Sequence, residues 1–398
     1  MTTDDLGQFR LWGLSAGEYV VVADARTNTF VPPNAPPETE EERVGFVTTY
    51  YPGTLDETSA QRLRVKAGEE TQGIDIRVGQ ARLYHISGSA VDSKGNPVVG
   101  GNGQLMRRGA SLGASMPLFV MTDPKGQFQV RNVPPGDYRL TLRPPQANVV
   151  PFSDDRTREP VEMANVSISI GSADIDNLLV VTSLGVTISG RVVFEQGPPT
   201  TSSNPMRVMA LPLSPEDSAG VPSPPPATIA EDSSFTLKGL MGEYGLRVAI
   251  PNQFIKSVTV NGDDVTDVPR EFKSSDRVTI TVTSRVSTVE GNVTDMRDVQ
   301  LSEAGVILFS EDKASWRFTS LWTRRTGVDP NGHFRITGLI PGKYYVAAIP
   351  RQRLALQGGP EAAAAFFEQL AKEATTVVLG AEDQRTVDLR MLDTFARQ

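Results

Sequence analysis

The residue types that carry most enzyme chemistry are scarce in this chain. Its 398 residues include no cysteine and only two histidines, His85 and His333. Thiolate nucleophiles, disulfides and cysteine-ligated metals are therefore excluded. Histidine-based acid–base schemes and histidine-rich metal sites have almost no residues to draw on. We therefore predict that the chain is not an enzyme and has no catalytic, cofactor-binding or metal-ligating residues.

Carboxylates are more plentiful, and two groups of them are close in sequence. Asp263, Asp264 and Asp267 form one group, and Asp154 and Asp155 form the other. Glycoside hydrolysis needs two carboxyl groups that face each other across a cleft at a set separation. Neighbouring residues on one loop do not supply that geometry, so we expect both groups to be solvated turns.

The aromatic residues of segment 316–322 suggest a binding surface. If the segment is a strand, Trp316, Phe318 and Trp322 share one face of it. Flat aromatic rings on an exposed sheet face stack on sugar rings, and nearby arginines such as Arg324 add hydrogen bonds to hydroxyls. The segment is therefore a candidate glycan-binding site. The alternative is that this face is the inner core of a sheet, with the arginines pointing outward.

The element that positions these residues is a repeat. A phenylalanine is followed several residues later by a glycine, then by one further residue, a tyrosine and an apolar run, and this pattern occurs four times. The copies span Phe9–Tyr19, Phe128–Tyr138, Phe235–Tyr244 and Phe334–Tyr344. Their spacing, near one hundred residues, is too long for a solenoid repeat and suits a β-sandwich domain. The pattern predicts an all-β array of tandem sandwich domains.

Turn chemistry supports these predicted strands. The segments 123–126 and 329–332 have the sequence Asp-Pro-x-Gly, which is typical of a type I turn. Their aspartates could hold calcium, although the turn alone explains them. A tyrosine just after a glycine corner buries its ring and returns its hydroxyl to upstream backbone. One helix is predicted over 361–373, with an apolar stripe of Phe366, Phe367 and Leu370 that packs on a sheet.

The repeat predicts four units. Unit one (1–83) begins in the middle of the pattern, and we expect its first strands to be missing. Unit two (84–183), a divergent unit three (184–284) and unit four (285–398), which holds the helix, are predicted to be complete seven-stranded sandwiches. Residues 31–42 are expected to be an exposed loop and residues 211–226 a Pro- and Ser-rich insertion.

The composition limits the classes of partner that the chain is expected to bind. The net charge of −8 disfavours nucleic acid, because phosphate binding needs clustered lysine and arginine. No apolar run approaches 18 residues, so no membrane span is predicted. The first ten residues, MTTDDLGQFR, do not have the charge and apolar pattern of a signal peptide.

The segments SGSAVDSKGNPVVG and TDPKGQFQVRNVPPGDYRLTL of unit two, and VDPNGHFRITGLIPGKYYVAA of unit four, resemble bacterial carboxypeptidase regulatory-like domains. This is a prealbumin-like sandwich related to the Cna-B repeats of surface adhesins. The resemblance implies a non-catalytic, extracellular or cell-surface protein that binds a partner and spaces domains apart. A polysaccharide-binding array, or an accessory region of a larger secreted hydrolase or outer-membrane receptor, are the alternatives. The isopeptide cross-link of the Cna-B relatives would need a buried lysine, for which Lys238 is the best candidate.

Overall fold

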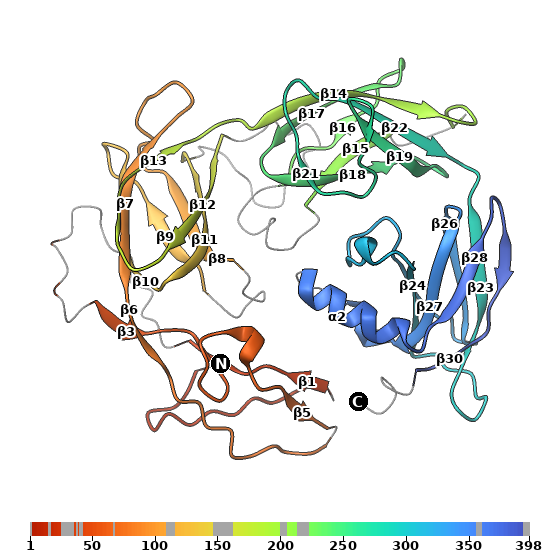
Figure 1. Ribbon diagram of the computed structural model, residues 1–398, viewed down its shortest axis with the longest axis horizontal. Helices are drawn as coiled ribbons and strands as arrows, with labels where there is room; N and C mark the ends of the chain where they lie inside the picture. The colour runs from red at the N-terminus through yellow and green to blue at the C-terminus, as the bar shows by residue number, and fades with distance from the viewer. Residues whose placement is uncertain are drawn as a thin grey trace.

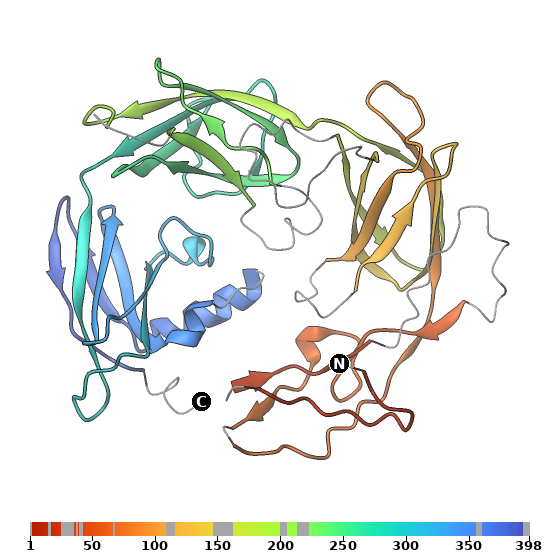
Figure 2. The ribbon, with the colours of Figure 1, turned by 180° about the vertical axis from the view of Figure 1, so that it is seen from behind.

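The structure is a computed structural model that describes residues 2–14, 17–24, 36, 39, 43–66, 68–108, 116–145, 162–199, 205–212, 223–355 and 360–392. These residues form an all-β protein of tandem sandwich domains, and the α-helix among them is short and lies near the C-terminus, which confirms the predicted fold class. Figures 1 and 2 show the units following one another along a curve, with the helix on its inner side. Segment 213–222 and most of 31–42 lie outside the described residues.

Unit two contains a three-stranded and a four-stranded sheet, ordered β10-β7-β13 and β12-β11-β8-β9. The core between them is built from the alternate, inward-facing residues of both sheets. Its strands are β7 (Tyr84–Val91), β8 (Asn102–Arg107), β9 (Leu118–Met121), β10 (Gln127–Val133), β11 (Gly136–Arg143), β12 (Ala164–Ile170) and β13 (Ile175–Val181).

Unit three has the same two layers with extra short strands. Its sheets are ordered β17-β14-β22-β19-β20 and β16-β15-β18, and β21 pairs with β18. The strands are β14 (Val186–Phe194), β15 (Arg207–Leu211), β16 (Ala227–Thr228), β17 (Ser234–Leu240), β18 (Glu243–Ala249), β19 (Phe254–Val260), β20 (Asp263–Asp264), β21 (Arg270–Glu271) and β22 (Arg277–Thr283).

Unit four adds the helix to this plan. Its sheets are ordered β26-β23-β29, with β30 also on β23, and β25-β24-β27-β28. Helix α2 (Pro360–Ala371) packs on the outer face of the second sheet, which confirms the predicted docking of its apolar stripe. The other elements are β23 (Ser287–Thr294), β24 (Ala304–Ser310), η2 (Lys313–Ser315), β25 (Arg324–Gly327), β26 (His333–Leu339), β27 (Gly342–Pro350), η3 (Arg351–Ala355), β28 (Thr375–Leu379), β29 (Gln384–Thr386) and β30 (Leu389–Arg390).

Unit one has only short, two-stranded pairings in its described residues: β1 with β5, β2 with β4 and β3 with β6. The pairing of β1 with β5 has the register of β11 with β12 in unit two, because the glycine and tyrosine of the repeat occupy the same positions in both. Its elements are β1 (Gly17–Tyr19), β2 (Val22–Ala23), β3 (Val44–Phe46), β4 (Thr49–Tyr50), η1 (Glu57–Ser59), β5 (Leu63–Val65) and β6 (Gln80–Arg82).

The repeated tyrosine performs the predicted corner function. The hydroxyl of Tyr138 donates to the carbonyl of Pro134 at 2.8 Å, and that of Tyr344 donates to Ile340 at 2.8 Å. Both rings are 2% exposed. Burial raises the pKa of Tyr344 to about 12, because the ionised phenolate would lose its hydration. These residues are therefore structural.

The first strand of each complete unit has a glycine at a position where close packing leaves no room for a side chain. A Cβ at Gly88 would lie 2.0 Å from the carbonyl oxygen of Leu178, and one at Gly291 would lie 2.1 Å from that of Val387. The backbone of the neighbouring parallel strand therefore occupies the space that a side chain would need. The sequence Ser/Glu-Gly in these strands marks this approach.

Candidate functional site

Segment 316–322 is not a strand, so the condition for a shared aromatic face is not met. It is a run of turns between η2 and β25, in which the amide of Ser320 donates to the carbonyl of Arg317 at 3.1 Å. The amide of Thr323 then donates to the carbonyl of Ser320 at 3.2 Å. These local hydrogen bonds involve backbone groups that would otherwise pair with a neighbouring strand. The aromatic residues therefore do not share one face of a strand.

Trp316 is buried beneath helix α2. Its side chain is packed against Phe309 and Phe367, with ring centroids 6.0 and 6.3 Å away, and the residue is 7% exposed. Its indole Nε1 donates to the carbonyl of Ser310 at 2.9 Å. The ring and its polar group are therefore both used inside unit four.

Phe318 and Trp322 are half-buried on either side of this turn. Phe318 packs on Phe366 and Phe367 of the helix, with centroids 5.5 and 5.4 Å away. Trp322 packs against the core between the two sheets of unit four. The rings thus contribute to two different cores and do not form one exposed platform. Glycan binding by this segment stays a prediction, without the flat aromatic surface that motivated it.

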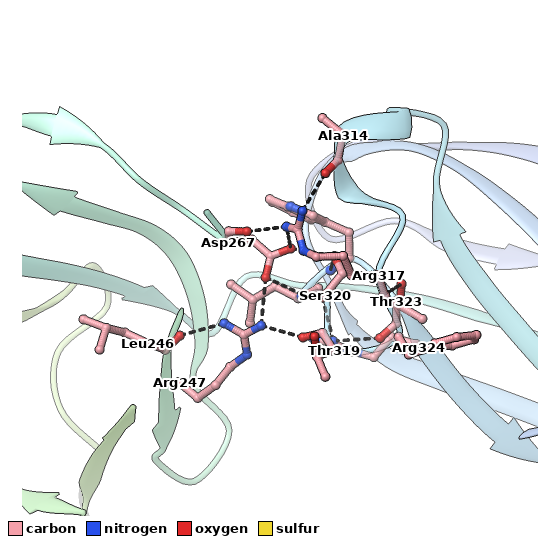
Figure 3. Close-up of polar contacts among 12 residues, drawn as sticks. Leu246, Arg247, Asp267, Ala314, Arg317, Thr319, Ser320, Thr323 and Arg324 are labelled. Atoms are coloured by element: carbon pink, nitrogen blue, oxygen red, sulfur yellow. Dashed lines mark hydrogen bonds and ion pairs between the residues drawn. The ribbon is translucent and has the colours of Figure 1, made fainter. Parts of the chain in front are cut away.

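The same turns bring unit four against unit three, and the centre of the contact is Asp267 (Figure 3). Asp267 lies between β20 and β21 of unit three, and its side chain is 1% exposed. Its Oδ1 accepts from Nη2 of Arg247 at 2.8 Å within unit three. Its Oδ2 accepts from Nη2 of Arg317 at 3.1 Å and from Oγ of Ser320 at 2.6 Å, both of unit four.

Backbone groups complete this junction. The amide of Leu321 donates to Oδ1 of Asp267 at 2.9 Å, and Arg317 donates to the carbonyl of Asp267. In the other direction, Nη2 of Arg247 donates to the carbonyl of Thr319 at 2.6 Å. Each unit therefore both donates to and accepts from the other. Asp267 reaches this position with a φ of 58°, in the left-handed region that aspartate tolerates better than most residues.

Apolar contacts seal the polar centre. Leu321 of unit four packs against the hydrophobic core of unit three. A Cβ at Gly338 of unit four would lie 2.2 Å from the ring of Phe254 in unit three, so the ring lies directly on the glycine backbone. The cavity left along this seam has a volume of about 10 Å³, which is about the space of one water molecule.

Burial lowers the pKa of Arg247 and of Arg324, whose charge is opposed there by loss of hydration. Asp267 raises both values again through its opposite charge. Nη1 of Arg324 also donates to the carbonyl of Leu321 at 2.6 Å. Because a buried charge is stable only when it is paired and hydrogen-bonded, Asp267 is the group on which this cluster depends.

This site was not predicted from the sequence. Asp263, Asp264 and Asp267 were expected to form a solvated turn. Asp263 and Asp264 are exposed, as expected, but form the short strand β20, and the prediction is wrong for Asp267, which is buried. Its two arginine partners lie 20 and 50 residues away, in different units. The other acidic pair, Asp154 and Asp155, lies outside the described residues.

The seam between units two and three is looser. A long hydrogen bond crosses it among the described residues, from Nδ2 of Asn165 to the carbonyl of Met241 at 3.5 Å. A cavity of about 430 Å³ opens between the units, with Arg108 and Arg139 on one side and Glu243 and Glu271 on the other. This volume fits many ordered waters, so the two units are not in dry contact there.

A third polar cluster joins units one and two. Oδ2 of Asp174 accepts from Nη1 of Arg43 at 2.8 Å and lies 3.3 Å from Nδ1 of His85. Nε2 of His85 lies 3.0 Å from Oδ1 of Asp176, which also accepts from Ser87 at 2.7 Å. One of the two histidines is thus held between carboxylates at the boundary, whereas His333 is exposed on β26.

The turn aspartates are used by their own turns. Oδ1 of Asp123 accepts from the amides of Lys125 and Gln127, each at 2.8 Å, and Oδ1 of Asp329 accepts from the corresponding pair in unit four. Among the described residues, no group of three or more histidine or acidic side chains is arranged to hold a metal ion. Lys238 is exposed on β17 and not in a core, so it is not placed for an isopeptide bond.

Residues 109–113 have the sequence Gly-Ala-Ser-Leu-Gly, which fits the Gly-x-Ser-x-Gly pattern of serine hydrolases. The segment lies outside the described residues. In α/β-hydrolases, the serine of this pattern needs a histidine base and lies on a strand-to-helix turn. The one described α-helix is α2, which is far from residues 109–113 in sequence. The five-residue pattern alone therefore does not indicate a hydrolase.

No protein-family model matches the sequence. No curated protein matches it either. Among solved structures, the Bacillus anthracis TIE protein aligns over 87% of this chain and 57% of its own, at 12% identity and a TM-score of 0.19. The chain thus spans little more than half of that protein's length.

Two pilins also align with the structure. The streptococcal ancillary pilin aligns over 78% of this chain and 100% of its own, at 10% identity and a TM-score of 0.22. BcpA, the major pilin subunit of Bacillus cereus, aligns over 77% and 99%, at 11% identity and a TM-score of 0.20. All are multidomain proteins at a low TM-score, so these similarities assign no role to this chain. In the described residues, no helix is long and apolar enough to cross a membrane.

Proposed function

We propose that the chain is a non-catalytic scaffold of an extracellular or cell-surface protein, which holds β-sandwich units at fixed relative positions and presents their loops and sheet faces to a partner. The observation that carries this proposal is the junction at Asp267. A fully buried carboxylate shared by arginines of two units, with an apolar seal around it, serves to fix one unit against the next. The domain boundaries at 83, 183 and 284 are part of the proposal.

The placement of the titratable groups supports a non-catalytic function. Buried ionisable side chains in clefts often mark active sites. In this chain, Asp267 pairs with two arginines, Tyr344 holds a corner and His85 lies between carboxylates at a boundary. Each of these groups has a structural partner already. Binding to a surface protein or polysaccharide would then use exposed loops and sheet faces.

The extracellular location rests on the resemblance to carboxypeptidase regulatory-like domains, and it can be tested directly. Intact cells of the source organism would be treated with a lysine-reactive biotin reagent that does not cross membranes. Lys94, Lys125 and Lys313 are exposed and should react before the cells are lysed. A cytoplasmic protein followed in parallel should stay unlabelled. Labelling of this chain only after lysis would contradict the proposed location.

A further inference from the structure

The repeat reveals an unoccupied strand position in unit one. Phe128, Val130 and Val133 of β10 are 2%, 4% and 0% exposed, because β10 pairs with β7 and points these side chains into the core. The repeat places Phe9, Leu11 and Leu14 of unit one at the same positions. They are 37%, 42% and 40% exposed.

The correspondence between the two segments is supported by their turns. Oδ1 of Asp4 accepts from the amides of Leu6 and Gln8, as Oδ1 of Asp123 does from residues two and four further on. Gly7 has a φ of 78° and Gly126 a φ of 75°. Residues 4–14 therefore begin like the hairpin of unit two, yet among the described residues no strand pairs with residues 8–14.

On the other side of the position, residues 74–78 pair with no strand among the described residues, although the amide of Arg77 donates to the carbonyl of Pro52 at 3.3 Å. In unit two, β7 lies between β10 and the parallel strand β13. Within β13, the left-handed residue Asn177 is followed by Leu178 and the buried Val180. In unit one, the left-handed Gly73 is followed by residues 74–78, whose alternate apolar residues are half-buried. Nη2 of Arg10 lies 3.7 Å from Oε1 of Glu70, which precedes residues 74–78 by four positions. Segments 8–14 and 74–78 therefore lie on the same side of the unit.

We propose that unit one accepts a β-strand supplied from outside these 398 residues, antiparallel to residues 8–14 and parallel to residues 74–78. Strand addition of this kind satisfies unpaired backbone groups and buries alternate side chains. The three complete units specify the chemistry of the strand. It is short, its inward residues are apolar, and it carries glycine opposite Phe9, as Gly88, Gly190 and Gly291 lie opposite the phenylalanines of the other units.

A second copy of this chain is a poor source of the strand. The three strands of this class that the structure describes, β7, β14 and β23, each have a neighbour on both sides. A copy would have to open one of its own sandwiches to donate any of them. The proposed partner is therefore a different polypeptide segment, and this inference does not depend on where the protein resides.

The test uses the whole chain and a fluorescein-labelled peptide with the sequence of residues 84–91, YHISGSAV. The change in anisotropy should saturate at protein concentrations below about 1 mM. The peptide with Gly88→Val should bind at least about tenfold more weakly, because its side chain meets the parallel backbone. On binding, hydrogen exchange should slow at residues 8–14 and 74–78.

Protein variants locate the binding. Phe9→Asp should weaken binding by about tenfold or more, whereas Phe119→Asp, at a more exposed apolar position on β9, should leave it unchanged. Both residues are solvent-exposed, so both variants should fold. Three results would overturn the proposal: no binding of YHISGSAV, equal binding of the Gly88→Val peptide, or a dimer of the peptide-free chain in which residues 8–14 are already protected.

Discussion

Asp267 of unit three accepts a hydrogen bond from Arg317 of unit four at 3.1 Å while its other carboxylate oxygen accepts one from Arg247 at 2.8 Å. One carboxylate thus joins two guanidinium groups across a domain boundary, and its side chain is 1% exposed. Units three and four are joined by a linker of three residues, 284–286, and this contact fixes their relative position.

Removing this carboxylate should destabilise the chain strongly. Asp267→Ala leaves two arginines close together in a poorly hydrated site without an opposite charge, which costs about 3–5 kcal/mol. The measurement is the free energy of unfolding in urea, followed by circular dichroism. Asp263→Ala, at an exposed residue of β20 four residues before Asp267, should change this free energy by less than about 0.5 kcal/mol. Equal effects of the two substitutions would show that Asp267 is not a special position.

The helix of unit four should depend on one aromatic residue. Phe367 is fully buried, and its ring lies 4.9 Å from that of Phe309 and 5.4 Å from that of Phe318. Phe367→Ala should reduce the stability of unit four by about 3–5 kcal/mol, because it leaves a cavity between helix and sheet. Tryptophan emission should shift to the red as Trp316 becomes hydrated. An unchanged emission spectrum would place α2 elsewhere.

The glycine of the first strand should tolerate no side chain. In Gly88→Ala, the new methyl group would meet the carbonyl of Leu178, and we expect a loss of about 3 kcal/mol as the parallel strands are forced apart. Gly171→Ala is the matched control, since a Cβ there meets nothing within 4 Å. Thermal unfolding of the two variants would decide, and a Gly88→Ala protein as stable as the control would refute the observed packing.

The contact between units one and two should weaken in acid. Burial opposes the charge of Asp174, but hydrogen bonds from the amide of His85 and from Arg43 outweigh it and hold the pKa of Asp174 below its usual 3.8. Because its pKa is lower in the folded state, Asp174 stabilises the protein above the unfolded pKa, and this contribution is lost as the pH falls through the folded value. His85, Arg43 and Asp176 are the ionisable groups of this contact.

A pair of unfolding series tests this pH dependence. The difference in stability between the wild type and Asp174→Asn should be constant above about pH 5 and shrink as the pH falls below the unfolded pKa of the carboxyl group. A difference that stays the same over this range would mean that the carboxylate is not charged in the native contact.

The repeated residues were predictable because their partners are local. The corner of Tyr138 and the turn of Asp123 each use backbone groups within four residues, so their type and spacing are visible in the sequence. Helix α2 was equally visible from its alanines and its apolar stripe. The residues that join units were not predictable, because Asp267 contacts Arg317 only after two sandwiches have folded.

The error at segment 316–322 has a similar origin. A shared aromatic face required this segment to be a strand. Instead, Ser320 and Thr323 close local turns, with Trp316 under the helix and Trp322 in the other core. Periodicity records which side chains are apolar, and it does not record which of two cores each one enters.

The central claim is that Asp267 fixes unit three against unit four, and a distance measurement tests it most directly. Because the chain has no cysteine, Thr236→Cys on β17 and Thr376→Cys on β28 introduce the only two spin-label sites, both exposed. Double electron–electron resonance should give one narrow distance distribution, which becomes broad when Asp267→Ala is added. A distribution that is already broad with Asp267 present, or that stays equally narrow without it, would contradict the account.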